Sequence, residues 1–205
     1  MSQVYPLFST PLYVSFIKQE NIEGVLDFAK TCKFTRLNQG PFYTSDSYII
    51  DRLPNFKNNI IECVNDYFFN YLKLDTSLKY YFPDSWFTKF EPFSLCKRHF
   101  HSNSLFSGVV YIDTEDKGNI NFVHPNIFGN SLGLTKTALS YVEHNIFNSE
   151  TWSEVPKNNK IIIFPSFLPH SIEENLGKED RYSFAFNILL EDYKCEIDTA
   201  KILER

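Results

Sequence analysis

The stretch that decides the fold is RYSFAFNILL, residues 181–190, near the end of a chain of 205 residues. Its aromatic side chains recur at every second position, which is the period of a β-strand. One face of such a strand carries Arg181, Ser183, Ala185 and Asn187, and the other face carries Tyr182, Phe184 and Phe186. We therefore predict a strand that packs its aromatic face outward and places Arg181 and Ser183 inside a barrel.

A buried arginine at position 181 requires an anionic partner, because an unpaired buried charge is costly. A carboxylate is the best partner, since a guanidinium binds it with two parallel hydrogen bonds. Two sources of that carboxylate are open at this point: a ligand, or an Asp or Glu of the chain itself.

Six more short runs have β-like patterns: 84–90, 94–100, 106–113, 119–123, 160–165 and 169–174. Turn-forming residues separate several of them, and the chain is rich in aromatic residues, with 21 Phe and 12 Tyr. Aromatic residues favour sheets, so we predict a mainly β sandwich or jelly-roll barrel that begins at about residue 78. Residues 126–155 are predicted to form a long loop with some helix, which is typical of a lid.

The first third of the chain has a different pattern. Residues 4–16 are predicted to be extended, and Asn21 is predicted to cap a short helix. Apolar residues at three- and four-residue steps predict a longer helix over 55–74, with Pro54 in its first turn. We expect a single domain, 1–205, in which 1–77 is an N-terminal extension with helices and 78–192 is the jelly-roll core.

The composition excludes several classes of function. The net charge is −5 and the basic residues are dispersed, so no nucleic-acid binding is expected. No apolar run approaches about 18 residues, and no signal-peptide pattern opens the sequence, so neither a membrane span nor secretion is expected. The four cysteines form no CxxC pair, which predicts reduced thiols and a cytoplasmic protein.

The run from Arg98 to Asn103 contains two histidines, His99 and His101, spaced two residues apart. On a strand they point to the same side, as would Asn103 if the strand continued. Two converging imidazoles are good ligands for iron, copper, nickel or zinc. Without a further ligand, the alternative is a pair of surface or hydrogen-bonded histidines.

A third histidine, His170, follows a buried apolar run that ends at Pro165. If it meets the HxH pair, the three imidazoles occupy one face of an octahedron and leave three positions for a chelating cosubstrate and oxygen. Arg181 would lie deeper and hold the far carboxylate of that chelator. Tyr111 shares a strand face with Ser107, and its hydroxyl is a candidate second donor to the same carboxylate.

These segments resemble the 2-oxoglutarate/iron(II) oxygenases common in marine phages and bacteria, which are distantly similar to prolyl hydroxylases. The resemblance is carried by HxHxNSxxSGVxY (99–111), GxIxF (118–122), FPSxLPHS (164–171) and RxSxxFN (181–187), with YPLFSTPLY (5–13) and Ser85-Trp86. The motifs follow the same order along nearly the whole chain.

The resemblance implies a double-stranded β-helix, or jelly roll, with the N-terminal helices packed on one sheet. It implies iron(II) at His99, His101 and His170, and 2-oxoglutarate at Arg181, Ser183 and Tyr111, with ascorbate as reductant. Asn103, Asn187 and Trp86 are expected near the substrate or behind the ligands. The implied reaction is hydroxylation of a small-molecule or peptide substrate, with peptidyl or free proline suggested by the relatives.

One departure concerns His101, because most of the superfamily has Asp or Glu there. Three interpretations are open: a three-histidine iron site; a site in which His101 and Asn103 replace the usual pair; or weak metal binding and no catalysis. We favour the first, because it keeps the superfamily's two-residue spacing. His124 and His144 lie outside the matched positions.

Two other functions compete with the oxygenase. One is a non-catalytic jelly-roll module that binds carbohydrate or serves in a virion. The other is a three-histidine cupin dioxygenase that does not use 2-oxoglutarate. The sequence leaves the oligomeric state open, and the expected location is the cytoplasm, that of a host if the gene is viral.

Overall fold

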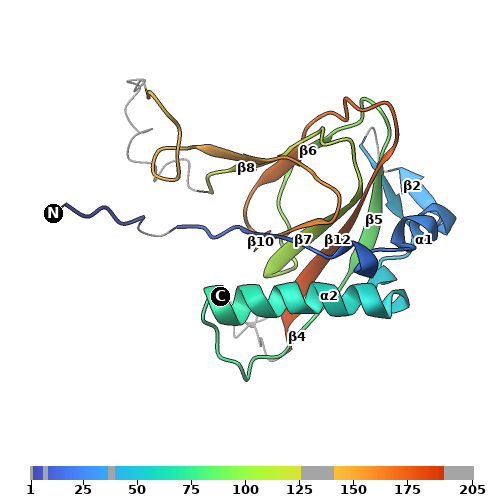
Figure 1. The fold of residues 1–205 in the computed structure, drawn as a ribbon, viewed down its shortest axis with the longest axis horizontal. Helices are drawn as coiled ribbons and strands as arrows, with labels where there is room; N and C mark the ends of the chain where they lie inside the picture. Colours follow the sequence, from blue (N-terminus) through green and yellow to red (C-terminus); the bar gives the residue numbers. More distant parts are fainter. Residues whose placement is uncertain (1, 7–8, 37–39, 126–140, 192–205) are drawn as a thin grey trace, which may run out of the picture.

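The protein is described here by a computed structural model that covers residues 2–6, 9–36, 40–125 and 141–191. Within these ranges, strands form two sheets, one of eight strands and one of four (Figure 1). The larger sheet has the order β1-β10-β7-β12-β5-β3-β2, and β4 pairs separately with β12. The smaller sheet has the order β6-β11-β8-β9.

The larger sheet places β12, the last strand of the described residues, at its centre, between β7 and β5. Its strands are β1 (Tyr13–Phe16), β2 (Phe34–Arg36), β3 (Phe42–Thr44), β4 (Tyr80–Tyr81), β5 (Ser85–Phe90), β7 (Phe106–Asp113), β10 (Lys160–Pro165) and β12 (Arg181–Leu190). The strands of the smaller sheet are β6 (Cys96–His99), β8 (Ile120–Val123), β9 (Thr151–Glu154) and β11 (His170–Ile172). All the pairings between named strands are antiparallel.

The predicted mainly β fold is confirmed, with a jelly-roll arrangement of two sheets. The predicted runs 106–113, 160–165 and 181–190 coincide with β7, β10 and β12 residue for residue. These three strands are adjacent in the larger sheet. Their strong apolar or alternating patterns come from burial on one or both faces, which is why the sequence identified them well.

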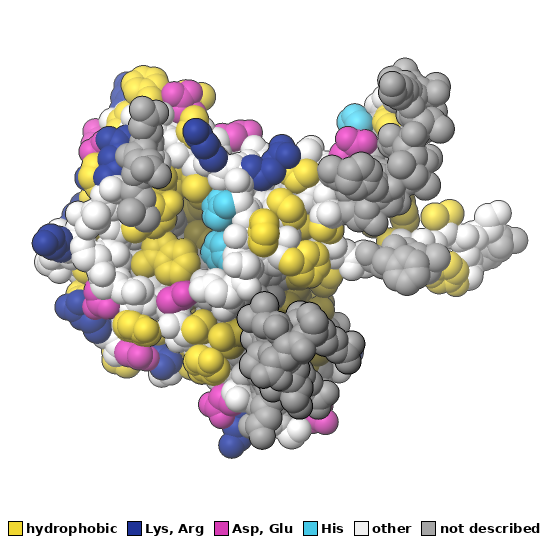
Figure 2. Space-filling model, turned by 180° about the vertical axis from the view of Figure 1, so that it is seen from behind, with side chains coloured by type: hydrophobic (Ala, Val, Ile, Leu, Met, Phe, Trp, Pro, Cys, Tyr) yellow, Lys and Arg dark blue, Asp and Glu magenta, His cyan; other side chains and the backbone are white. Residues whose placement is uncertain are grey.

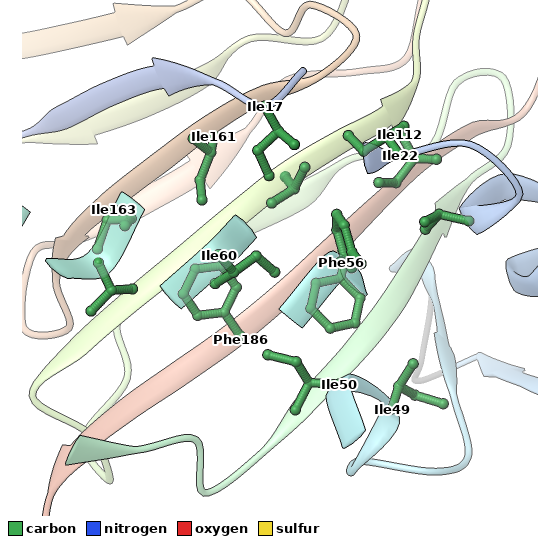
Figure 3. Close-up of a cluster of buried hydrophobic side chains, with 14 of the residues drawn as sticks. Ile17, Ile22, Ile49, Ile50, Phe56, Ile60, Ile112, Ile161, Ile163 and Phe186 are labelled. Carbon is green, nitrogen blue, oxygen red and sulfur yellow. The ribbon is translucent and has the colours of Figure 1, made fainter. Parts of the chain in front are cut away.

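The helices pack on the outer face of the larger sheet (Figure 1). They are α1 (Val25–Thr31), α2 (Pro54–Asn65), the 3₁₀ helices η1 (Gln19–Asn21) and η2 (Ile49–Arg52), and the π-helix η3 (Asp66–Tyr71). Figure 3 shows Phe56 and Ile60 of α2 against Phe186 of the sheet. Phe56 also meets Phe184 edge-on, with ring centroids 5.2 Å apart. Burying each such side chain stabilises the fold by about 1.5–3 kcal/mol.

The predicted helix over 55–74 begins with Pro54 at its first position, as expected, but it is α-helical only to Asn65. A π-helical turn follows and ends at Tyr71. A π-helix has more residues per turn than an α-helix, so the apolar stripe is shifted in phase. Tyr67 and Phe68 remain buried, whereas Tyr71 is exposed.

Three local predictions were wrong. Asn21 does not cap a helix: its side chain donates to Asn59 at 2.6 Å, and α1 begins after Gly24, whose φ is 76°. Strands do not begin at about residue 78, because β1, β2 and β3 precede it and join the larger sheet. Residues 151–154 form β9 instead of a loop, while 126–140 lie outside the described residues.

Two further observations concern the described residues as a whole. No helix among them has the length and apolar character needed to cross a membrane. Cys32, Cys63 and Cys96 are free thiols, in agreement with the expected absence of disulfides among them, and Cys195 lies outside the described residues.

Candidate metal centre

Three histidines converge between the two sheets. His99 ends β6 and His170 begins β11, and these two residues are paired directly across the antiparallel ladder. His101 follows β6 by two residues, and its backbone N–H donates to the Ser166 carbonyl at 2.9 Å. One nitrogen from each ring lies within 4.8 Å of the others. The tertiary structure thus joins two distant segments of sequence at a single point.

Each of the three rings has its Nδ1 atom engaged with an oxygen. The Nδ1 atom of His99 lies 2.9 Å from the Lys97 carbonyl, and that of His170 lies 3.0 Å from the Leu168 carbonyl. The Nδ1 atom of His101 lies 2.7 Å from Oδ1 of Asn187. Because carbonyl oxygens only accept, each Nδ1 carries the hydrogen, and the Nε2 lone pairs remain for a cation.

The electrostatic environment keeps His170 neutral, which is the state that binds a metal. Burial lowers its pKa to about 3. Burial also lowers the pKa of His101, whereas the hydrogen bond with Cys96 raises the pKa of His99. The His170 ring is held on its other sides by Phe164, at a centroid distance of 4.8 Å, and by Phe122 at 6.1 Å.

Arg181 is buried deeper in the same region, with 2% of its surface exposed. Its Nη1 donates to the carbonyls of Gly118, at 2.6 Å, and Lys117, at 3.1 Å, and its guanidinium lies over the Phe90 ring. Among the described residues, no carboxylate pairs with it, and its Nε and Nη2 atoms are buried without a hydrogen-bond partner. The fully buried Tyr111 hydroxyl is likewise without a partner in this part of the chain.

These orphaned donors fit an anionic ligand. Burial lowers the pKa of Arg181 and raises that of Tyr111, and each of the two groups partly offsets the shift of the other. Buried donors without partners are rare in folded proteins, because each costs about 1–3 kcal/mol. A carboxylate that accepts from both groups would remove this cost.

A pocket connects the metal centre to the solvent. Its lining includes the three histidines, Trp86 and Ser183. Figure 2 shows histidine side chains on the wall of a hollow that is bordered largely by hydrophobic side chains. The pocket therefore combines a polar end with apolar walls, as small-molecule sites usually do.

The remaining predicted site residues are placed as follows. The Trp86 ring lies 6.2 Å from that of His101, and the Ser183 hydroxyl is bonded to Thr88 at 2.6 Å. Asn187 contacts His101 directly. Asn103 is exposed in a bend, because β6 ends at His99 and the strand does not continue.

The other histidines and the second tryptophan lie outside the cluster of three. His124 and His144 are exposed, and His144 packs against Tyr141. Trp152 is on β9 and donates to Glu154 at 3.1 Å.

Sequence reasoning missed two contributors to this site. Asp84 bonds to Asn187, and the carbonyl of Gly118 holds Arg181. Gly118 lies in the GxIxF motif, so the sequence could have indicated its role in the site. Asp84 is an isolated acidic residue before a strand, and no motif marks it.

Comparison with known proteins identifies the family. Residues 84–187, half of the chain, match the family model described as "Putative 2OG-Fe(II) oxygenase". The chain belongs to this 2OG-Fe(II) oxygenase family. It is therefore an enzyme, a 2-oxoglutarate- and iron(II)-dependent dioxygenase, and the non-catalytic binding module is not supported. No curated protein matches the sequence.

Solved structures show that this oxygenase shares its fold with distant proteins. A 2OG-Fe(II) oxygenase family oxidoreductase from Burkholderia pseudomallei is 11% identical, with a TM-score of 0.59 over 86% of this chain and 83% of its own. HygX from Streptomyces hygroscopicus, solved with nickel and 2-oxoglutarate bound, is 10% identical, with a TM-score of 0.58 over 87% and 82%. A prolyl-4-hydroxylase from Pseudomonas putida is 12% identical, with a TM-score of 0.55 over 88% and 94%.

Proposed function

We propose that the oxygenase holds iron(II) with His99, His101 and His170, and 2-oxoglutarate with Arg181 and Tyr111. The observation that carries this proposal is the convergence of three imidazoles in the same region as a buried guanidinium that, among the described residues, pairs with no carboxylate and keeps two nitrogens without a partner. Imidazoles fit iron(II), and the guanidinium with the tyrosine hydroxyl fits the distal carboxylate of 2-oxoglutarate. HygX, which has a similar fold, was solved with 2-oxoglutarate and in a separate form with iron.

The chain's own residues have distinct tasks in this proposal. Iron(II) and 2-oxoglutarate held by these residues would supply the oxidising chemistry with dioxygen: one oxygen atom would enter the substrate C–H bond, the other would enter succinate, and carbon dioxide would leave. Arg181 and Tyr111 would bind the distal carboxylate of 2-oxoglutarate and so orient the cosubstrate. Ser183, on β12, would assist at the same carboxylate. The apolar walls exclude water, which strengthens the charged contacts inside.

We infer a three-histidine site in preference to the alternative in which His101 and Asn103 replace the usual pair. The exposure of Asn103 and the engagement of all three Nδ1 atoms support this assignment. Asn187 and Trp86 would lie beside His101, the first behind the ring and the second facing the pocket.

Beyond the family chemistry, we propose a small-molecule or peptide substrate, with free or peptidyl proline as the first candidate and ascorbate as reductant. Support for proline is the shared fold with the prolyl-4-hydroxylase.

We also propose a single domain, supported by the pairing of β1 with β10 and of β3 with β5. We further propose that the protein comes from a phage or a marine bacterium. Its proposed location is the cytoplasm, which is that of the host if the gene is viral. The three free thiols fit such a reducing compartment.

Anaerobic binding tests the proposal directly. Apoprotein given iron(II) and then 2-oxoglutarate should develop a charge-transfer absorption band, and air with ascorbate should yield succinate. His170→Ala should lose metal binding. Arg181→Ala should keep it but need about ten- to a hundredfold more 2-oxoglutarate, since each charged hydrogen bond contributes about 1.5–3 kcal/mol.

Arg36→Ala, a change at an exposed arginine on β2, is the matched control and should behave as wild type. Wild-type metal affinity in His170→Ala would refute the ligand assignment. Substrate oxidation without 2-oxoglutarate would instead support the three-histidine cupin reaction.

A further inference from the structure

His101 differs from the other two histidines in what lies behind its ring. Its Nδ1 atom lies 2.7 Å from Oδ1 of Asn187, and Nδ2 of that amide donates to Oδ1 of Asp84 at 2.6 Å. Asn187 is 3% exposed, so its amide is shielded from water, whereas Asp84 and His101 are half-buried. An unbroken chain of short hydrogen bonds therefore links a carboxylate to this imidazole.

The carboxylate determines the direction of every bond in that chain. Ionised Asp84 can only accept, so the Asn187 amide must turn its NH₂ group toward it. The amide oxygen then faces His101, and it too can only accept. His101 must therefore carry its hydrogen on Nδ1, which leaves the Nε2 lone pair for the cation.

Three serine hydroxyls, of which those of Ser107 and Ser166 are buried, extend the same chain. Ser107 donates to Asn187 Oδ1 at 2.7 Å, and its oxygen also lies 2.9 Å from Nδ1 of His101. Its hydroxyl is 2.8 Å from that of Ser166, which is 2.8 Å from that of Ser104. Because the amide oxygen only accepts, all three hydroxyls can donate in one direction, toward Asn187. This arrangement leaves the His101 ring little freedom to rotate.

The other two rings have no such connection in the described part of the chain. Nδ1 of His99 and of His170 face the backbone carbonyls of Lys97 and Leu168, which are neutral dipoles, and Nδ1 of His99 also lies 3.7 Å from the Cys96 sulfur. Three neutral imidazoles bring no negative charge to a divalent cation. Asp84 is thus the acid that the hydrogen bonds connect to the site.

We propose that Asp84 is a positioning residue for the metal: through Asn187 it fixes the tautomer of His101 and supplies negative charge to the three-histidine centre. This inference rests on the proposed function, because it assumes that His101 binds the cation. It adds a role for a residue that touches neither metal nor cosubstrate.

The first test is the affinity of the apoprotein for Co(II), measured by calorimetry. Asp84→Asn keeps the size of the side chain and can still accept from Asn187, but it removes the charge. We expect about ten- to a hundredfold weaker binding, the usual loss when a group behind a metal ligand is changed. Asp75→Asn, at an exposed aspartate in a turn, is the matched control and should leave the affinity unchanged.

The second test separates this role from a general structural one. In a His101→Asp background, position 101 brings its own charge and has no Nδ1–H, so Asp84→Asn should no longer weaken Co(II) binding. Long-range ¹H–¹⁵N spectra of histidine-labelled apoprotein should show His101 as the Nδ1–H tautomer in wild type and as a mixture in Asp84→Asn.

The outcomes distinguish the two proposals. Three results would overturn the positioning role and leave the proposed function intact. They are an equal Co(II) affinity of wild type and Asp84→Asn, an equal loss of affinity from Asp84→Asn in the wild-type and His101→Asp backgrounds, and an unchanged His101 tautomer in Asp84→Asn. Failure of wild type to bind Co(II) at all would overturn the proposed function itself.

Discussion

Gly118 lies against the guanidinium of Arg181 and has a φ of 76°. A Cβ atom at this position would lie 2.6 Å from Nη1 and 3.1 Å from the Glu173 carbonyl oxygen. Glycine thus meets two demands here, a left-handed backbone and space for the arginine. Because the backbone of Gly118 comes close to the Arg181 guanidinium, its carbonyl can accept from Nη1. The Nε and Nη2 atoms then remain for a ligand.

Gly118→Ala should therefore impair cosubstrate binding as well as stability. We expect it to raise the 2-oxoglutarate concentration at half-saturation by about tenfold, the effect of losing one charged hydrogen bond. Gly24→Ala is a matched control, because Gly24 has the same φ of 76° but nothing within 4 Å of an added Cβ. Both changes should lower the free energy of unfolding by about 1 kcal/mol for the strained backbone.

Titration of 2-oxoglutarate into the iron(II) protein, followed by the absorption band, measures the difference. Equal half-saturation in both variants and wild type would show that Gly118 does not position Arg181.

At the scale of elements, β10 separates the two halves of the interior. Ile161 and Ile163 face the helices, whereas Ile162 belongs to the cluster between the sheets, beside the metal centre. β7 and β12 alternate in the same way, so three adjacent strands turn one face to α2 and the other to the site. The helix layer supports the larger sheet without touching the pocket.

Ile60→Ala on α2 should therefore destabilise the protein without changing the site. Ile60 is fully buried against the sheet, and its truncation should cost about 2–5 kcal/mol of unfolding free energy. The exposed Asn58→Ala on the same helix should change stability little. Urea unfolding measures the first effect and Co(II) calorimetry the second; a parallel loss of metal affinity would contradict this separation of layers.

At the scale of the whole molecule, the buried His170 makes folding sensitive to acid. His170 has a pKa of about 3 in the folded protein against 6.5 in the unfolded chain. Between these values the unfolded chain binds a proton that the folded protein does not, so the free energy of unfolding falls as the pH falls. The lowered pKa of His101 acts in the same direction, and the raised pKa of His99 opposes it.

Metal-free protein should consequently lose about 1.4 kcal/mol of stability for each pH unit between about pH 6 and pH 4.5. Urea unfolding of the apoprotein across this range measures the slope. His170→Gln should flatten it, whereas His144→Gln, a change at an exposed histidine, should not. A slope of zero in wild type would mean that His170 is not buried in its neutral form.

The sequence by itself determined the features that repeat along a single segment. The two-residue alternation of 181–190 identified β12 and the faces of Arg181 and Ser183, and the HxH spacing identified two of the three histidines. Such patterns are local, because burial of one strand face imposes them directly on the residue order. The short strands β2, β3 and β9 were not predicted. Each has only three or four residues, most of them exposed or half-buried, and so few residues show no clear alternation of apolar and polar side chains.

Only the tertiary structure decided which segments meet. Three features depend on how strands are ordered and aligned in the two sheets. They are the pairing of His170 with His99, the lack of an acid beside Arg181 in the described part of the chain, and the link from Asp84 to Asn187. Register is a property of pairs of strands, and a shift by one residue turns every side chain to the opposite face. The order of residues along one strand does not contain that information.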